Sequence, residues 1–173
     1  MERRGSGGPG PDVSLTRVHD DDAVVIAHAG PLLVAVFVGV ARVAHLDRLK
    51  ALADALIAEH GKLGLLLVAL ETRGGLRITT DVRQRAVEIT RELDRSMVGS
   101  AFVLRFGGLS GVIARTFLSW LNRLAGNRAP QRTCASVSEG LAWLQALPGH
   151  PVVVGETGLC AEIEAILTGR SGR

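Results

Sequence analysis

Apolar residues along the chain fall into short continuous runs that alternate with segments in which they recur every three or four positions. The continuous runs predict buried strands at residues 23–29, 32–38, 63–70, 101–104 and 132–137. Helical spacing predicts helices at residues 46–57, 81–93, 111–124, 138–147 and 159–167. Strands that alternate with helices predict an α/β domain in which right-handed crossovers join parallel strands.

Only Gly30-Pro31 separates the first two runs, which predicts an antiparallel turn instead of a crossover. Residues 13–18 fit either a short edge strand or a loop. We therefore expect a mixed, mostly parallel sheet of four to five strands, with an antiparallel N-terminal hairpin and amphipathic helices. The expected organisation is a disordered tail at residues 1–12, a domain at 13–148 and a C-terminal extension with a short helix at 149–173.

One apolar stretch, residues 23–41, is long enough to be a membrane span. His28, Gly30 and Pro31 interrupt it, and three aspartates directly precede it. Its many valines favour strands. We expect two buried strands here and no membrane contact, and the preceding aspartates also argue against a signal peptide.

The composition is that of a globular chain. Its 173 residues are 47% hydrophobic but only 3% aromatic, so we expect an aliphatic core. The net charge of +3 is mild. Cys134 and Cys160 have neither metal-ligand nor redox spacing, and without a secretion signal they predict a reducing, cytoplasmic location.

Six arginines and no acidic residue lie between Asp94 and Glu139. A surface of one sign could dock an acidic protein, nucleic acid or anionic lipid. These arginines do not share one helix face, and few aromatic residues lie between them for base stacking. We expect solvated or locally paired arginines, with no nucleic acid and no membrane as partner.

A Gly-rich turn joins the strand at 101–104 to the next helix. Amides at a helix N-terminus bind anions, and glycines let a ligand approach the backbone closely. The candidate ligand-binding residues are Arg105, Gly107, Gly108, Ser110 and Gly111. Their spacing matches neither a Walker loop nor a dinucleotide fingerprint. The alternative is a tight turn in which Ser110 is the N-cap of the helix.

The chain has no local catalytic or metal-binding pattern. Its five histidines lack metal-ligand spacing to cysteines or acids, and His28 falls where an interior strand histidine is expected. No serine lies in a nucleophile-elbow pattern. We predict no metal, no cofactor and no catalytic residue, although a triad assembled from distant residues stays open.

Several pieces between residues 23 and 147 follow one another in a specific order. They are Val38-Gly39-Val40, the run 63–70, Asp81-Val82-Arg83, the unit 103–108 with Arg115 after it, and Ala135-Ser136-Val137-Ser138-Glu139-Gly140-Leu141-Ala142-Trp143-Leu144. Their order and spacing resemble the STAS-like superfamily, the fold of bacterial anti-sigma-factor antagonists. The chain is similar to the STAS-like proteins of myxobacteria and other high-GC bacteria. The resemblance implies a non-catalytic regulatory module that acts through protein surfaces.

In this superfamily, phosphorylation of a Ser or Thr in an Asp-Ser-Ser/Thr-Gly motif switches partner binding. The motif begins the helix after the central strand, where this chain has Ile78-Thr79-Thr80-Asp81. The resemblance makes Thr79 or Thr80 the candidate phosphoacceptor, at a place where helix N-terminal amides would stabilise a phosphate. The alternative is a polar loop followed by a helix cap, since Asp81 and Gln84 have capping-box spacing.

The sequence therefore predicts a non-enzymatic regulatory or protein-interaction module of a bacterial cytoplasmic signalling pathway. We expect a protein partner and leave homo-oligomerisation open. The alternatives are a small anion- or nucleotide-binding protein that uses residues 107–111, and a membrane-associated protein that uses residues 23–41. The mean hydropathy of +0.26 favours an extra apolar surface, covered by another subunit or by the helix at 159–167.

Overall fold

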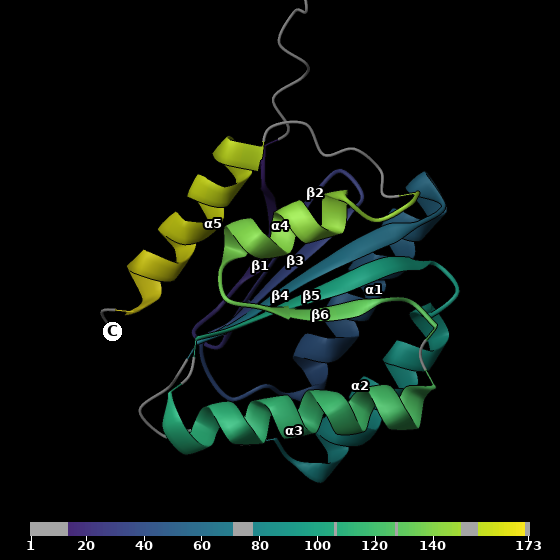
Figure 1. The fold of residues 1–173 in the computed structure, drawn as a ribbon, viewed down its shortest axis with the longest axis vertical. Coiled ribbons are helices and arrows are strands. Elements are labelled where there is room, and N and C mark those ends of the chain that lie inside the picture. The colour runs from purple at the N-terminus through teal and green to yellow at the C-terminus, as the bar shows by residue number, and fades with distance from the viewer. Residues whose placement is uncertain (1–13, 71–77, 106, 127, 150–155, 172–173) are drawn as a thin grey trace, which may run out of the picture.

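The computed structural model describes residues 14–70, 78–105, 107–126, 128–149 and 156–171. These residues form an α/β fold with a six-stranded mixed sheet (Figure 1). The strands lie side by side in sequence order: β1 (Thr16–Asp20), β2 (Val24–Ala29), β3 (Leu32–Phe37), β4 (Leu63–Leu70), β5 (Met97–Arg105) and β6 (Gln131–Cys134). β1 with β2 and β2 with β3 pair antiparallel, whereas β3 to β6 pair parallel.

The crossovers decide which face of the sheet each helix covers. α1 (Val43–His60), α2 (Thr80–Leu93) and α3 (Gly108–Ala125) each join two neighbouring parallel strands. Because the strands follow one another in one direction, right-handed crossovers place all three helices on one face. α4 (Val137–Gln145) and α5 (Glu156–Ser171) come after the last strand and cover the opposite face (Figure 1).

Side chains of β4 divide between two cores. Leu63 packs with residues of α1 and α2, whereas Leu66 and Val68 pack with residues of α4 and α5. Successive side chains of a strand point to opposite faces, so a strand covered on both faces needs apolar residues at every position. The continuous apolar runs in the sequence meet this requirement.

Residues 23–41 contain two strands and a tight turn. β2 and β3 pair in an unbroken register from Val24↔Phe37 to Ala29↔Leu32, and Gly30 turns the chain with φ of 53°. The antiparallel hairpin that Gly30-Pro31 predicts is thus confirmed. Within the described residues, no helix combines the length and the apolar character that crossing a membrane requires.

The prediction of four to five strands is wrong by one strand. The edge strand β1, which the sequence left undecided between strand and loop, pairs with β2. Most of its side chains are exposed, so backbone hydrogen bonds hold it and no apolar pattern identifies it. The predicted tail at residues 1–12 lies outside the described residues.

The start of α3 also differs from the prediction. The helix begins at Gly108, so Ser110 lies inside it and is not its N-cap. Gly108 has φ of 51°, which lets the chain turn into the helix direction two residues before the predicted cap. A glycine adopts this positive φ without the steric cost that a residue with a side chain would have there.

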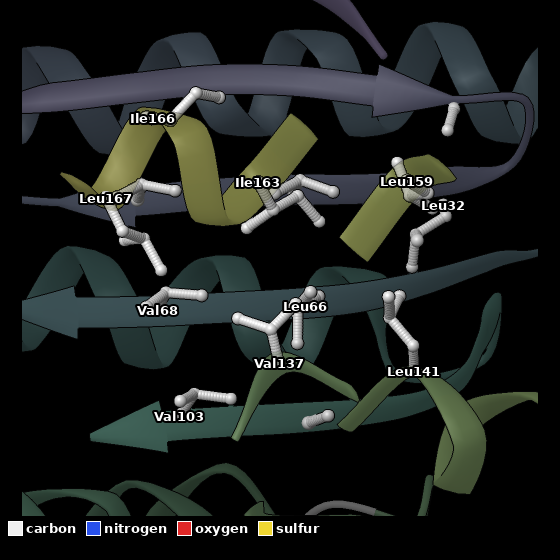
Figure 2. Close-up of a cluster of buried hydrophobic side chains, with 14 of the residues drawn as sticks. Leu32, Leu66, Val68, Val103, Val137, Leu141, Leu159, Ile163, Ile166 and Leu167 are labelled. Carbon is white, nitrogen blue, oxygen red and sulfur yellow. The ribbon is translucent and has the colours of Figure 1, made fainter. Parts of the chain in front are cut away.

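α5 contributes to the core between the sheet and α4. Leu159, Ile163 and Leu167 are fully buried and point from α5 toward the sheet, where Leu32, Leu66 and Val68 lie (Figure 2). This helix belongs to residues 149–173, which the sequence suggests to be an extension. The extension therefore supplies part of the main hydrophobic core.

Candidate functional site

α3 exposes the largest group of apolar side chains among the described residues. Four of the six exposed large hydrophobic side chains lie on it, and they are 38–51% exposed: Val112, Ile113, Trp120 and Leu124. We call these four residues the α3 outer face. Half-buried Phe117 extends this surface inward and stacks on Trp120, with ring centroids 6.0 Å apart. Such a surface on one helix is a candidate docking site.

The α3 outer face lies beside positive charge. Arg115 and Arg123 are exposed on the same helix, and α3 contains no acidic residue. Among the described residues, the structure gives neither arginine an acidic partner. The α3 surface therefore combines apolar and cationic character.

The predicted anion site at the start of α3 lacks the cation expected beside it. Nη2 of Arg105 lies 2.5 Å from Oε1 of Glu164 on α5, so its charge is matched by a carboxylate. The N–H of Gly111 donates to the carbonyl of Gly107 as part of the first helical turn. The side chain of Ser110 lies outside the described part of the chain. The geometry therefore gives little support to an anion cradle at residues 107–111.

The candidate phosphoacceptors lie at the N-terminus of α2. Thr79 is the N-cap residue and Thr80 is the first helical residue, and both are exposed. Asp81 lies in the first turn and not at the cap. A hydrogen bond from the Thr79 hydroxyl, and then one from the N–H of Val82, hold the pKa of the Asp81 carboxyl below its usual value. A phosphate on either threonine would therefore meet a neighbouring negative charge.

A cavity of about 190 Å³ lies between α3 and the sheet. Side chains of β4, β5 and β6 form its floor, α1 and α2 form its walls, and α3 forms its roof. Most of its lining is apolar, including Leu67, Phe102, Ile89, Phe117 and Leu121. A mostly apolar cavity with a few polar groups is the usual form of a small-molecule site.

Two polar side chains of the cavity lining have partners within the protein. The Thr90 hydroxyl donates to the carbonyl of Ala86 at 2.6 Å. Oδ1 of Asp94 accepts from the N–H groups of Arg128 and Ala129 at 2.8 Å and 3.2 Å. These groups hold α2 and the segment before β6 in place, so their hydrogen-bonding capacity is largely used.

Two other polar side chains, Ser100 and Gln131, lie next to each other on the cavity floor. They are paired residues of β5 and β6 and both line the cavity. Oε1 of Gln131 is buried and has no hydrogen-bond partner among the described residues. The Ser100 side chain is also buried, and its hydroxyl has no hydrogen-bond partner among the described residues.

A second polar cluster lies where the β1–β2 turn meets α1. Oδ2 of Asp21 lies 3.0 Å from Nε2 of His19 and 3.2 Å from Nε2 of His45. Oδ1 of Asp21 accepts from the N–H groups of Ala23 and Val24 at 2.9 Å and 2.8 Å. Two imidazoles and one carboxylate within reach of one another are also a ligand set that a metal ion could use.

The hydrogen bonds around the imidazoles favour a carboxylate clamp over a metal site. The N–H of Arg42 donates to Nδ1 of His45, so that neutral ring carries its proton on Nε2, facing Asp21. Nη1 of Arg48 lies 2.6 Å from Nδ1 and 3.0 Å from Nε2 of His19, so a guanidinium charge already lies against the second ring. At His45 this proton occupies the Nε2 lone pair that a metal ion would need, and at His19 the Arg48 guanidinium would repel a cation.

Replacing Asp21 by asparagine is expected to remove a pH-dependent part of the stability. Burial alone would raise the pKa of Asp21, but hydrogen bonds from Ala23, Val24 and His19, together with the electrostatic attraction of His45, hold it well below the usual value. Because the folded pKa is the lower one, the stabilisation is complete above the unfolded pKa of about 3.9 and is lost as the pH falls through the folded value.

Urea unfolding at a series of pH values measures this effect. Wild type should exceed Asp21→Asn by about 1–2 kcal/mol at pH 7, with the difference shrinking from about pH 4 downward. Asp22→Asn, at the exposed neighbouring position, is the control, and its difference from wild type should not depend on pH. A constant difference for Asp21→Asn between pH 2 and 7 would contradict the clamp.

Cys134 is not a candidate nucleophile in this structure. Its side chain is buried against the core that α4 and α5 cover. Burial, and then the nearby negative charge of Glu139, raise the pKa of the Cys134 thiol. The reactive thiolate is therefore scarce at neutral pH.

Comparisons of the chain with models of protein families, with curated proteins and with solved structures found no match. The candidate sites rest on geometry alone. Tertiary packing brings together groups that no local motif predicts, such as Ser100 with Gln131. A hydroxyl within the apolar β5 was the only sequence signal for this pair, whereas the α3 outer face follows from apolar residues on more than one side of the predicted helix.

Proposed function

We propose that the protein is a non-catalytic STAS-like regulatory module of a bacterial cytoplasmic pathway, and that it binds a protein partner through the α3 outer face. The observation that carries this proposal is the concentration of exposed apolar side chains on α3. Single exposed apolar residues are normal on a soluble protein, but a contiguous group marks an interaction surface. The order of strands and the antiparallel N-terminal hairpin are compatible with the STAS-like resemblance.

The charges beside the α3 outer face favour a different protein as partner. Two copies that met through this face would bring Arg115 and Arg123 of both chains into one interface without acidic residues from α3. Like charges at close range oppose such association. A partner protein with an apolar groove and an acidic rim would complement both the apolar side chains and the arginines of α3. Binding of anions at residues 107–111 is less favoured, because Arg105 is already paired with Glu164.

Replacing Trp120 by aspartate is expected to abolish partner binding while the fold is retained. Trp120 is more than one-third exposed, so its loss should change the free energy of unfolding by less than about 1 kcal/mol. Aromatic residues at the centre of an interface often contribute 2 kcal/mol or more, so the affinity should fall by roughly 30-fold or more. Affinity capture from extracts of the native cell should identify the partner, and calorimetry with the purified partner measures the loss.

Val18→Asp is the matched control for this experiment. Val18 is also an exposed apolar residue, but it lies on β1 and outside the α3 outer face. Its replacement should leave the affinity unchanged. Equal partner binding by wild type and Trp120→Asp would contradict the proposal. Dimerisation of wild type that Trp120→Asp removes, seen by light scattering, would identify a second copy as the occupant instead.

A further inference from the structure

We infer that the cavity beneath α3 is a binding site for a small apolar molecule that carries one hydroxyl group. This function differs from partner docking, because it uses the inner side of α3 and the sheet below. The inference rests on three features of the cavity: its size, its apolar lining, and two adjacent polar side chains on its floor that have no hydrogen-bond partner among the described residues.

The size of the cavity limits the ligand to a single small ring or a comparable aliphatic group. Its volume is about 190 Å³. An engineered protein cavity of about 150 Å³ that is lined by apolar side chains binds benzene. The cavity beneath α3 therefore has room for a benzene ring with one or two small substituents.

The apolar lining selects the body of the ligand. Phe102 of β5 and Phe117 and Leu121 of α3 approach the cavity from floor and roof, and Ile89 of α2 closes one wall. Aromatic rings of protein and ligand can pack edge to face or offset in such a space. An ionised ligand is disfavoured, because burying a charge needs a charged partner and the carboxylate of Asp94 already accepts two backbone hydrogen bonds.

The polar floor selects the functional group of the ligand. The buried Oε1 of Gln131 accepts hydrogen bonds and has no donor among the described residues. Ser100 is the residue of β5 that pairs with Gln131, and its hydroxyl can donate a hydrogen bond. A ligand hydroxyl would donate a hydrogen bond to Oε1 of Gln131 and accept one from the hydroxyl of Ser100. A hydrocarbon would leave both groups without a hydrogen bond. This complementarity points to a neutral phenol or small alcohol.

A matched pair of probes tests the inference on the full-length protein. p-Cresol and p-xylene have nearly the same shape and differ by a hydroxyl in place of a methyl group. Calorimetric titration should show saturable binding of p-cresol to wild type. In Gln131→Leu, the ratio of the p-xylene Kd to the p-cresol Kd should fall at least about tenfold, because only p-cresol uses the amide oxygen.

Thr133→Val is the matched control variant. Thr133 lies two residues further along β6, on the same face of the sheet, but is exposed and does not line the cavity. This variant should keep the wild-type ratio of the two dissociation constants. An equal change in both constants in Gln131→Leu, or the same loss of selectivity in Thr133→Val, would overturn the assignment of the hydroxyl to Gln131.

NMR on the wild-type protein keeps the test independent of any variant. Titration with p-cresol should shift the backbone amide resonances of Ser100, Gln131 and Ala114, which line the cavity, and leave those of α5 unchanged. Shifts confined to residues of the α3 outer face would place the probe on the surface and refute the site. If neither p-cresol nor p-xylene binds up to its solubility limit, the cavity site is refuted as well.

Discussion

Replacing Ile163 by aspartate is expected to leave the protein largely unfolded. Ile163 is 0% exposed and lies between α5 and the sheet, close to Leu32 and Leu66 (Figure 2). An aspartate at this position would be either an unpartnered buried charge or a buried acid that must first be protonated, and the isoleucine contacts would also be lost. We expect a destabilisation of at least about 4–5 kcal/mol.

That loss is close to the whole stability of many domains, which is about 5–15 kcal/mol. Circular dichroism and urea unfolding measure the effect. Ala165→Asp is the matched control, because Ala165 lies two residues away on the same helix and is exposed. It should change the free energy of unfolding by about 0.5 kcal/mol or less. Similar stabilities for the two variants would mean that α5 does not belong to the folded core.

Leu66→Ala is expected to destabilise the protein by about 3–5 kcal/mol, the upper part of the range for buried leucines. Leu66 is fully buried at the centre of the sheet, and a Cβ placed on Gly140 of α4 would come within 3.0 Å of its Cδ1. The close packing of α4 against the sheet leaves little freedom for the surroundings to fill the space of the lost side chain. Urea unfolding at neutral pH measures the change.

Leu67→Ala provides the comparison on the opposite face of the same strand. Leu67 is half-buried and lines the cavity beneath α3, so part of its side chain already lacks packing contacts. We expect Leu67→Ala to lower the free energy of unfolding by about 1–2 kcal/mol, which is less than for Leu66→Ala. Equal costs would indicate that α3 packs closely against the sheet in solution, and would argue against a ligand-sized cavity.

The regular elements were predictable where apolar spacing is strong. The run at residues 63–70 became β4 with the predicted bounds, because a strand between two layers of helices must be apolar at every position. β1 was not predictable in the same way, because edge pairing uses backbone groups that every residue carries. The start of α3 was misplaced because the conformation of Gly108, and not the capping ability of Ser110, decides where the helix begins.

The candidate sites were less predictable than the fold. Arg105 and the glycines after it form a local pattern that suggests an anion site, but a carboxylate 59 residues further along the chain pairs with the arginine. The Asp21 clamp likewise depends on His45, which α1 brings to the turn between β1 and β2. Local motifs contain no information about such long-range partners.

By itself, the sequence determined the alternation of strands and helices, the hairpin at Gly30 and the apolar residues of both cores. The spacing of apolar residues within a segment indicates which of them are buried, so burial can be inferred one segment at a time. Only the tertiary structure decided that α5 completes a core, that Arg105 is paired, and that Ser100 and Gln131 meet beneath α3. Those outcomes depend on strand register and on which helix covers which face, and both arise from packing between distant parts of the chain.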